Sequence, residues 1–574
     1  MVAAPMSPEV SVSKTLGRQT PARDLFLLIL VVVGVLSLFL GKAFTIDDPL
    51  FLWLAENIQQ DPLDFFGFEV NWYGTSMPMH EVTKNPPLMG YLIAAAASVV
   101  GWGEIALHLV FLLPAAAAAA ASYLLARRLC SRPLEASLIG LLTPAFLVSS
   151  SNVMCDTTMV AFWYGSIWCW LTGFDRRRWP WLLAAGVLAL LAGLTKYFGL
   201  ALVPLLLLHG AVLKRRLGAW SVFLLVPVLG MLGFESATRS LYGSGMLLEA
   251  AGYATSFKEQ FALSFARQAL VGLVYAGGCF LPALFFAPFL WPRRALIVGA
   301  AVVVLGAAGA DGLGTLLGAK AYGIDAWSPM SALQLALLAL SGVSLLALVA
   351  SDAWHGRDDE RWLLAAWVLG SFVFASFVNW TNNARSILPI APALGILLVR
   401  RLEWQSAGGR ALDPRHCLPA FAAGVAVALL VAWADYRWAN DVRETARSLA
   451  ARYVVEDRVT FFVGHWGFQY YMEQGGARAM DWDRDRVLEG QLLIRPTNNT
   501  EVPPPPSRYV ALLEETFQPG RLLATMSPRL GANFYSSTYA AFPFAFGSEM
   551  VDRYEVWETT QPFRHRDWRR PDDR

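Results

Sequence analysis

Long apolar runs alternate with short charged loops along most of the chain. The first run, residues 25–40, contains no charged residue, and similar runs recur as far as residue 433. Apolar stretches near 20 residues are typical of membrane-spanning helices, because a helix satisfies all its own backbone polar groups inside the bilayer. No cleavage site is evident after the first run, so we expect it to remain as an uncleaved helix. The pattern predicts an all-α polytopic membrane bundle.

Basic loops between the runs predict how the bundle is oriented. Short loops rich in Lys and Arg remain on the cytoplasmic side of a membrane. Lys14, Arg18 and Arg23 precede the first run, so residues 1–23 are expected to form a cytoplasmic tail. The first helix then runs outward, and residues 44–103 become one long external loop.

One apolar run, residues 88–100, is too short to span the bilayer comfortably. Counting it as a crossing would also place the basic loop at residues 127–132 outside, against the charge rule. We therefore expect it to lie along the outer leaflet. The remaining runs alternate between the two sides and give about 13 crossings over residues 24–434, with the C-terminus outside.

From Asp435 onward the chain becomes polar and densely charged. Residues 458–464 and 508–513 have the β-branched and aromatic content of strands, and Tyr470 and Tyr471 are expected on a helix between them. Residues 435–574 are therefore predicted to form a small external α/β domain.

Composition agrees with a membrane protein and excludes several other classes. The 574 residues are 56% hydrophobic and only 16% charged, whereas soluble domains have about 25% charged residues. No basic cluster interleaves with aromatic residues, so nucleic acid is not an expected partner. The five cysteines show no CxxC spacing, which argues against a zinc site or a disulfide framework.

Two adjacent acids, Asp47 and Asp48, follow the first membrane helix. Charge at a membrane boundary is costly unless it faces water or has a function. The pair could simply end the helix in water, with Asp48 and Pro49 starting a turn. Alternatively, one acid could be the general base that takes a proton from an acceptor hydroxyl. Asp47 is favoured because it lies nearer the helix.

A second polar cluster, His80, Glu81 and Lys84, lies farther along the same external loop and precedes Pro86 and Pro87. Prolines break regular structure and fix the approach to the next apolar run. Lys84 just above the outer leaflet could pair with a lipid phosphate. It could equally be an ordinary snorkelling lysine.

Four further candidates occur at external ends of the predicted helices: Asp156, Lys196, Tyr197 and Arg385. Asp156 lies between two short apolar runs and is expected to face a wet cavity. Lys196 suits phosphate as a point charge. External arginine runs against the positive-inside bias, so Arg385 is expected to bind phosphate or to pair with an acid.

These residues together resemble the dolichyl-phosphate-mannose–protein mannosyltransferase superfamily. They look most like its bacterial branch, which includes aminoarabinose transferases and lipopolysaccharide-core glycosyltransferases. The motifs that carry the resemblance are Asp47-Asp48, Lys84-Asn85-Pro86-Pro87-Leu88, Asp156, Leu194-Thr195-Lys196 and Arg385-Ser386-Ile387-Leu388-Pro389. Relatives commonly have Asp-Glu at the first motif, no residue between Lys and Pro-Pro at the second, and Tyr where Ser386 stands.

The resemblance implies a GT-C fold and inverting transfer of a monosaccharide from a polyprenyl-phosphate donor. The acceptor would be an envelope glycolipid, polysaccharide or protein, outside the inner membrane of a bacterium. Asp47, Asp48 and Asp156 would be catalytic, and His80, Glu81, Lys84, Lys196, Tyr197 and Arg385 would bind substrate. Nothing resembles the cation-binding motif of oligosaccharyltransferases, so neither a metal nor another cofactor is expected.

Two other functions fit a polytopic membrane protein. A transporter or flippase for a lipid-linked or small polar substrate is the main alternative, although transporters tend to have repeats and midplane charges. A non-catalytic scaffold with a glycosyltransferase-like fold is the other. The candidate charges favour the enzyme, since they are expected at one external face.

Overall fold

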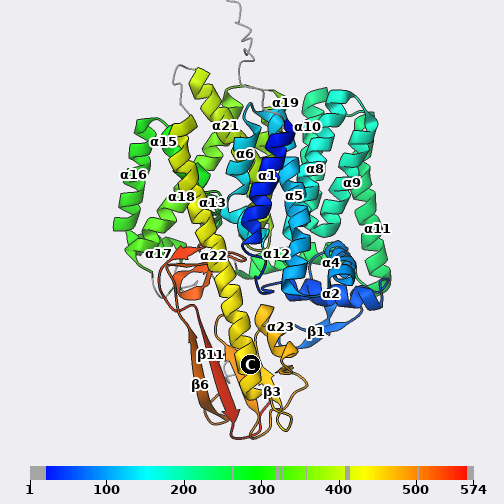
Figure 1. Ribbon diagram of the computed structural model, residues 1–574, viewed down its shortest axis with the longest axis vertical. Helices are drawn as coiled ribbons and strands as arrows, with labels where there is room; N and C mark the ends of the chain where they lie inside the picture. The colour runs from blue at the N-terminus through cyan, green and yellow to red at the C-terminus, as the bar shows by residue number, and fades with distance from the viewer. Residues whose placement is uncertain are drawn as a thin grey trace, which may run out of the picture.

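The computed structural model describes residues 21–261, 264–318, 324, 327–356, 358–407, 414–500, 503–538 and 540–564. The predicted cytoplasmic tail lies outside these residues as far as residue 20. Long helices run side by side through most of the molecule, and a smaller part that contains strands extends from one end of them (Figure 1). This arrangement confirms the predicted fold class, a helical membrane bundle followed by a small α/β region.

The bundle consists of long helices together with shorter, broken ones. They are α1 (Pro21–Ser37), α5 (Glu104–Leu129), α6 (Pro133–Leu141), α7 (Pro144–Ser149), α8 (Cys155–Arg176), α9 (Trp179–Thr195), α10 (Leu202–Lys214), α11 (Leu225–Tyr242), α13 (Phe265–Cys279), α14 (Pro282–Phe285), α15 (Ala287–Leu290), α16 (Arg293–Ala308), α18 (Pro329–Trp354), α19 (Asp359–Val373), α20 (Ala384–Ile387), α21 (Ala391–Ala407) and α22 (Pro414–Tyr453).

Length and composition alone identify fewer spans than the charge pattern predicts. Among the described residues, 6 helices are long and apolar enough to cross a membrane, or up to 7 if α16 and α17 (Ala310–Leu317) are one bent span. Other predicted crossings coincide with short helices placed end to end. Pro144, for example, begins α7 directly after the break that ends α6, as expected where proline removes a helical hydrogen bond. The chain is a multi-pass membrane protein.

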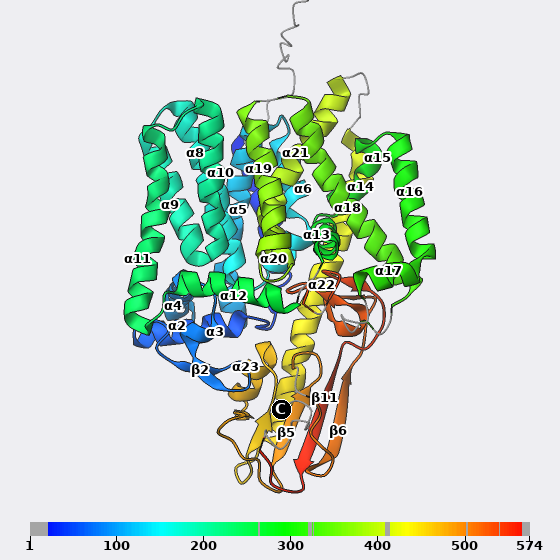
Figure 2. The same cartoon turned by 180° about the vertical axis from the view of Figure 1, so that it is seen from behind.

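The predicted external loop folds into small elements at one end of the bundle. They are α2 (Asp48–Gln60), β1 (Glu69–Asn71), β2 (Ser76–Pro78), α3 (Met79–Val82) and α4 (Leu88–Val100). Gly90 of α4 packs so closely on Leu54 of α2 that a Cβ at Gly90 would lie 2.6 Å from the leucine side chain. Both views show α4 beside α2 at the end of the bundle (Figures 1 and 2). The 88–100 run therefore lies at the end of the bundle and does not extend along it. This agrees with the expectation that the run is not a crossing.

The basic loops gather at the opposite end of the bundle (Figure 2). There, Arg128 in the last turn of α5 forms salt bridges with Asp175 at 2.7 Å and Glu360 at 2.9 Å. Arg400 of α21 pairs with Asp352 at 3.1 Å. The predicted cytoplasmic loops thus share one end, and the 44–103 loop occupies the other.

The C-terminal region begins within a helix. The helix α22 has 40 residues and continues without a break through Asp435, where the composition changes. Beyond α22 lies a five-stranded sheet in the order β4-β3-β5-β11-β6. Its strands are β3 (Thr460–Phe462), β4 (Arg478–Ala479), β5 (Leu492–Pro496), β6 (Val510–Gln518) and β11 (Asp552–Thr559), and α23 (Trp466–Gln474) follows β3. The two strands and the helix predicted from the sequence correspond to β3, β6 and α23.

One segment of the C-terminal region turns back to the helices. Residues 523–546, here called the insert, contain β7 (Leu523–Ala524), β8 (Met526–Ser527), β9 (Ala532–Asn533) and β10 (Ala545–Phe546). The Gln334 side chain of α18 donates to the Phe544 carbonyl at 2.6 Å and accepts from the Phe546 amide at 3.0 Å. The insert therefore packs against the same end of the bundle as the external loop (Figure 1).

Candidate active site

Four of the predicted residues meet where several helices end. Asp47 precedes α2, Asp156 is in the first turn of α8, Lys196 separates α9 from a 3₁₀ turn, and Arg385 lies in the single turn of α20. The breaks in the chain at these positions leave the side chains pointing into one place. Sequence positions more than 300 residues apart are thereby brought together.

The four charges alternate in sign along a chain of ion pairs. Lys196 Nζ donates to Asp156 Oδ1 at 2.6 Å. Asp156 Oδ2 lies 3.7 Å from Arg385 Nη1, and the same nitrogen donates to Asp47 Oδ2 at 3.0 Å. The chain runs Lys196, Asp156, Arg385, Asp47.

Burial differs sharply along this chain. The side chain of Asp156 is 1% exposed, whereas that of Asp47 is 29% exposed. Arg385 and Lys196 lie between these extremes, at 10% and 19%. Of the two carboxylates in this chain of ion pairs, Asp47 is therefore the one that a substrate can reach. Asp156 also lies at the positive N-terminus of α8, which favours its ionised form.

The acidic turn, residues 44–48, is held from both sides. The Phe44 amide donates to the Tyr471 hydroxyl at 2.8 Å, and the Thr45 amide donates to Asp48 Oδ2 at 2.8 Å. Ile46 between them has φ of 50°, a left-handed conformation that is strained for a β-branched residue and persists only where its surroundings impose it. This turn points Asp47 toward Arg385 while Asp48 points inward.

Asp48 does not join the chain of ion pairs. Its side chain is completely buried, and its Oδ1 atom has no hydrogen-bond partner in the part of the chain that the structure describes. Burial raises the pKa of Asp48 to about 7, because a carboxylate loses its hydration there. Of the two adjacent acids, only Asp47 is presented to the open side of the site.

The second polar cluster lies apart from these four residues. The His80 ring stacks on Tyr242 with centroids 4.8 Å apart, and its Nε2 atom is 4.0 Å from Glu81. Lys84 Nζ donates to the Glu81 carbonyl at 2.7 Å and lies 5.8 Å from the centre of the Tyr253 ring. Within the described ranges, no hydrogen bond or ion pair joins His80 or Glu81 to Asp47 or Arg385.

Lys84 nevertheless stays near the site through its neighbour. The Cys155 thiol, which precedes Asp156, donates to Asn85 Oδ1 at 3.9 Å. Among the described residues Lys84 forms no salt bridge with a carboxylate, and burial lowers its pKa. It is a cation whose charge is not already neutralised by a direct partner.

Tyr197 follows Lys196 and extends the site toward α11. Its ring lies 6.5 Å from that of Phe234. Its hydroxyl is buried and has no hydrogen-bond partner among the described residues. A buried polar group without a partner is unusual in a native structure, so this hydroxyl is available to a ligand.

A second buried network beside the site was not identified from the sequence. Lys42 Nζ pairs with Asp435 at 2.5 Å, and both side chains are completely buried. Lys42 also donates to Asn152 Oδ1, and Asp435 accepts from Tyr535 at 2.8 Å. Lys42 and Asp435 each follow an outward crossing, where charge signals a specific role. For Asn152 and Tyr535 the sequence carries no such signal.

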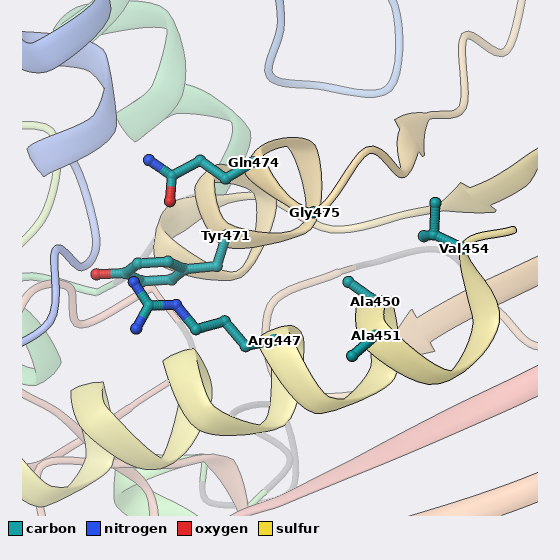
Figure 3. Close-up of a pocket in the computed structure, with 7 residues that line it drawn as sticks. All are labelled: Arg447, Ala450, Ala451, Val454, Tyr471, Gln474 and Gly475. Carbon is teal, nitrogen blue, oxygen red and sulfur yellow. The ribbon is translucent and has the colours of Figure 1, made fainter. Parts of the chain in front are cut away.

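A separate pocket lies in the C-terminal region (Figure 3). It has a volume of about 340 Å³ and lies between α22 and α23. Its lining residues are Arg447, Ala450, Ala451, Val454, Tyr471, Gln474 and Gly475. The Arg447 guanidinium lies over the Tyr471 ring, 5.0 Å from its centre. Tyr471 links the pocket to the acidic turn, because its hydroxyl contacts the Phe44 amide.

A family comparison supports the resemblance inferred from the motifs. A family model described as dolichyl-phosphate-mannose-protein mannosyltransferase matches residues 84–236. The matched segment contains Lys84, Asp156 and Lys196, whereas Asp47 and Arg385 lie outside it. The glycosyltransferase resemblance is therefore confirmed for this part of the chain. No curated protein matches the sequence.

Several solved structures resemble the chain at low identity. ArnT from Cupriavidus metallidurans bound to undecaprenyl phosphate is 15% identical with a TM-score of 0.49, and the alignment covers 83% of this chain and 94% of ArnT. An Archaeoglobus fulgidus oligosaccharyltransferase tethered with an acceptor peptide is 14% identical with a TM-score of 0.44, covering 79% and 63%. The arabinosyltransferase EmbB from Mycobacterium smegmatis is 16% identical with a TM-score of 0.32, covering 75% and 42%.

Proposed function

We propose that this chain, whose residues 84–236 match the mannosyltransferase family model, is an inverting glycosyltransferase. It moves a monosaccharide from a polyprenyl-phosphate donor to an envelope acceptor, which is a glycolipid, a polysaccharide or a protein. The observation that carries this proposal is the chain of alternating charges formed by Lys196, Asp156, Arg385 and Asp47. It combines a reachable carboxylate with cations suited to a phosphate.

Asp47 is the general base in this proposal. Its carboxylate is the most exposed of the acids in the chain of ion pairs, and an acceptor hydroxyl can approach it from the open side. The hydrogen bond from Arg385 Nη1 to Asp47 Oδ2, at 3.0 Å, holds the carboxylate in place for the acceptor. Asp47 takes the proton of the acceptor hydroxyl as its oxygen attacks the anomeric carbon.

The bond changes balance without any further reactant. The new bond joins the acceptor oxygen to the anomeric carbon, and the bond from that carbon to the phosphate oxygen breaks with its electron pair on the phosphate. Attack opposite to the leaving group inverts the anomeric configuration. The products are the glycosylated acceptor and the polyprenyl phosphate, and the acceptor proton remains on Asp47.

Arg385, Lys196 and Lys84 stabilise the leaving phosphate, on which negative charge grows in the transition state. Preorganised cations in a partly buried site act strongly on such developing charge. Arg385 offers planar paired donors, while the lysines act as point charges. Lys84 has no salt-bridge partner among the described residues, so it can bind the phosphate without first breaking an ion pair.

Asp156 is assigned a positioning role. Its side chain is 1% exposed and pairs with both Lys196 and Arg385, so it reaches the substrate only through these cations. The resemblance implies a catalytic role for Asp156. Its contacts favour a different role, in which one buried carboxylate fixes the two cations relative to each other.

The proposed setting is the outer face of a bacterial inner membrane. The basic loops at the end opposite to the site favour a cytoplasmic N-terminus and a periplasmic or extracellular C-terminal region. No cofactor is proposed besides the lipid-linked sugar, which is a substrate. A transporter gains less support, because the candidate charges lie at one end of the bundle and not midway along it.

Mass spectrometry of envelope glycolipids and proteins tests the proposal in a strain that lacks the gene. Return of the wild-type gene should restore a mass difference of one sugar on one class of molecule. Asp47→Asn should lower transfer by about 100-fold or more, because general bases contribute about 10²–10⁴-fold. Asp61→Asn is the matched control, since Asp61 is an exposed acid of the same loop whose side chain, among the described residues, accepts only local backbone bonds.

Immunoblots of the membrane fraction ensure that each variant is expressed and inserted. Near-normal transfer by Asp47→Asn would refute its role as the base. An identical mass profile with and without the wild-type gene would refute the proposed function itself.

A further inference from the structure

The insert of the C-terminal region lies directly against the helical turn that carries Arg385. The Ala384 amide, adjacent to Arg385, donates to the Phe534 carbonyl at 3.1 Å. The Ser537 amide donates to the Asn382 carbonyl at 2.8 Å. These bonds lie just before position 385 in the bundle and flank position 535 in the insert, so the two backbones are fixed relative to each other.

A third bond anchors the insert from another helix. The Tyr275 hydroxyl of α13 donates to the Asn533 carbonyl at 2.6 Å. Together these contacts hold the insert on residues of the bundle as well as on its own region. Tyr535 lies between the anchored positions and is 3% exposed.

The Tyr535 ring supports the Arg385 guanidinium. Arg385 Cζ lies 5.3 Å from the centre of that ring, which is within the range of a cation–π interaction. The Tyr535 hydroxyl donates to Asp435 Oδ2 at 2.8 Å and accepts from Asn152 Nδ2 at 3.1 Å. Since both ends of the side chain are held, the ring presents a fixed plane to Arg385.

This support leaves hydrogen-bond donors of Arg385 unused. Arg385 Nη1 contacts Asp47 Oδ2 at 3.0 Å and Met154 Sδ at 3.0 Å, whereas its Nε atom is buried without a partner among the described residues. A carboxylate in place of Tyr535 would occupy donors and neutralise the charge. An aromatic face orients the guanidinium and keeps its N–H groups available for a phosphate.

We propose that Tyr535 is a positioning residue for the transfer reaction and that the C-terminal region thereby completes the active site. Tyr535 holds the Arg385 guanidinium in the plane that meets the leaving phosphate. The inference rests on the proposed function for the role of Arg385 in catalysis. The contact between the two side chains can also be tested without any transfer assay.

The first measurement is kinetic and uses purified full-length protein in proteoliposomes with the undecaprenyl-phosphate sugar that the wild type transfers. Tyr535→Leu should lower kcat by about 10-fold, the scale of a desolvated cation–π contact, with the KM for acceptor unchanged. Tyr535→Phe keeps the aromatic face and should restore kcat to within about threefold of wild type. Phe542→Leu should match the wild type, because Phe542 is a buried aromatic of the same insert that packs on Trp327.

The second measurement is the rate at which phenylglyoxal modifies Arg385, followed by peptide mass spectrometry. Tyr535→Leu should raise this rate several-fold, while Tyr535→Phe and Phe542→Leu should leave it unchanged. Equal labelling of Arg385 in wild type and Tyr535→Leu would overturn the proposal. So would equal losses of kcat in Tyr535→Leu and Phe542→Leu, which would mean that the insert only needs its packing.

The two proposals fail in different ways. If the wild type transfers none of a panel of undecaprenyl-phosphate sugars and its envelope profile equals that of the deletion strain, the proposed function fails. The labelling of Arg385 then decides alone whether Tyr535 positions it. If the wild type is active and Tyr535→Leu equals it in both measurements, only the inference about Tyr535 fails.

Discussion

Asp47 and Asp48 are adjacent in the chain but occupy opposite sides of the acidic turn. Asp47 is 29% exposed and pairs with Arg385, whereas Asp48 is completely buried and accepts the Thr45 amide. The difference follows from the left-handed backbone at Ile46, which turns one carboxylate outward and the other inward. Burial raises the pKa of Asp48 to about 7, because its carboxylate has lost its hydration.

The raised pKa of Asp48 predicts a pH-dependent contribution to stability. Its folded-state pKa of about 7 lies above the unfolded value of 3.8, so the folded state retains a proton that the unfolded state has lost. Stability therefore falls as pH rises from about 4 to about 7 and is level above that, with a total of about 4 kcal/mol at most. Asp48→Asn should remove this slope.

Unfolding temperatures are measured in detergent by tryptophan fluorescence. The unfolding temperature of Asp48→Asn relative to that of wild type should be higher at pH 8 than at pH 5, because only the wild type loses stability as pH rises. Asp61→Asn, at an exposed acid of the same loop, serves as the control. Parallel curves for Asp48→Asn and wild type would contradict the assignment of a buried, protonated Asp48.

The buried carboxylate of Asp156 pairs with two cations, and substitution of Asp156 tests how much these pairs contribute to stability. Asp156→Asn leaves Lys196 without its partner and Arg385 with Asp47 alone, so the free energy of unfolding should fall by about 3 kcal/mol. Asp175→Asn at the opposite end breaks a pair whose carboxylate is 48% exposed, and its cost should be below about 1 kcal/mol. Urea unfolding of both variants in detergent compares them. Equal costs would contradict the buried role of Asp156.

At the scale of residues, the sequence was most informative at the ends of apolar runs, where charged residues are uncommon. Asp47, Asp156, Lys196 and Arg385 were recognisable because each is an ionisable residue at the external end of an apolar run. The structure brings these four together. His80 and Glu81 were candidates as polar residues of the external loop, but they contact Tyr242 and Lys84, because position along a loop does not determine where the loop folds.

At the scale of elements, close helix contacts determine where Arg385 is held. The turn α20 continues through Leu388–Ile390 into α21, and α21 packs tightly on α6. A Cβ at Gly395 of α21 would lie 1.9 Å from the Ala136 carbonyl, and a Cβ at Gly140 of α6 would lie 2.2 Å from the Ala391 carbonyl. Small residues permit such approach between membrane helices.

Gly395→Ala should therefore push α21 away from α6 and displace Arg385. Overpacking of this kind costs about 1–3 kcal/mol, and transfer should decline with it. Gly34→Ala in α1 is the matched control, because nothing lies within 4 Å of a Cβ there. Thermal unfolding and transfer activity are measured for both. A Gly395→Ala protein as stable and active as the control would contradict the close-contact role.

Hydrophobic patterning predicted the elements of the bundle better than their continuity. The apolar runs correspond to helices, and the 88–100 run, which the charge rule did not count as a crossing, is the short helix α4 at the end of the bundle. Breaks such as that between α6 and α7 were less evident, since proline marks a break without specifying how the helix resumes. The full length of α22 was not predicted either. Its composition changes at Asp435, which suggested a boundary, whereas the helix continues through that residue.

At the scale of the whole molecule, the C-terminal region contacts the candidate site in two places. Gly467 of α23 packs so closely on the acidic turn that a Cβ would lie 2.2 Å from the Phe44 carbonyl. The insert contributes Tyr535 to the surroundings of Arg385. Such long-range contacts were not predictable, because nothing in the local pattern of residues 523–546 indicates which distant helices they meet.

The buried pair of Lys42 and Asp435 predicts how firmly these parts are joined. Lys42 follows the first membrane helix and Asp435 lies in α22, and both side chains are completely buried. Lys42→Met leaves a buried carboxylate without its cation, so the free energy of unfolding should fall by about 3–5 kcal/mol. Adding Asp435→Leu removes that uncompensated charge and should restore much of the loss, although Tyr535 and Thr525 then lose an acceptor.

Urea unfolding of the two single variants and the double variant completes a double-mutant cycle. Additive losses would contradict a direct coupling between the bundle and α22, whereas a double variant more stable than Lys42→Met alone would support it.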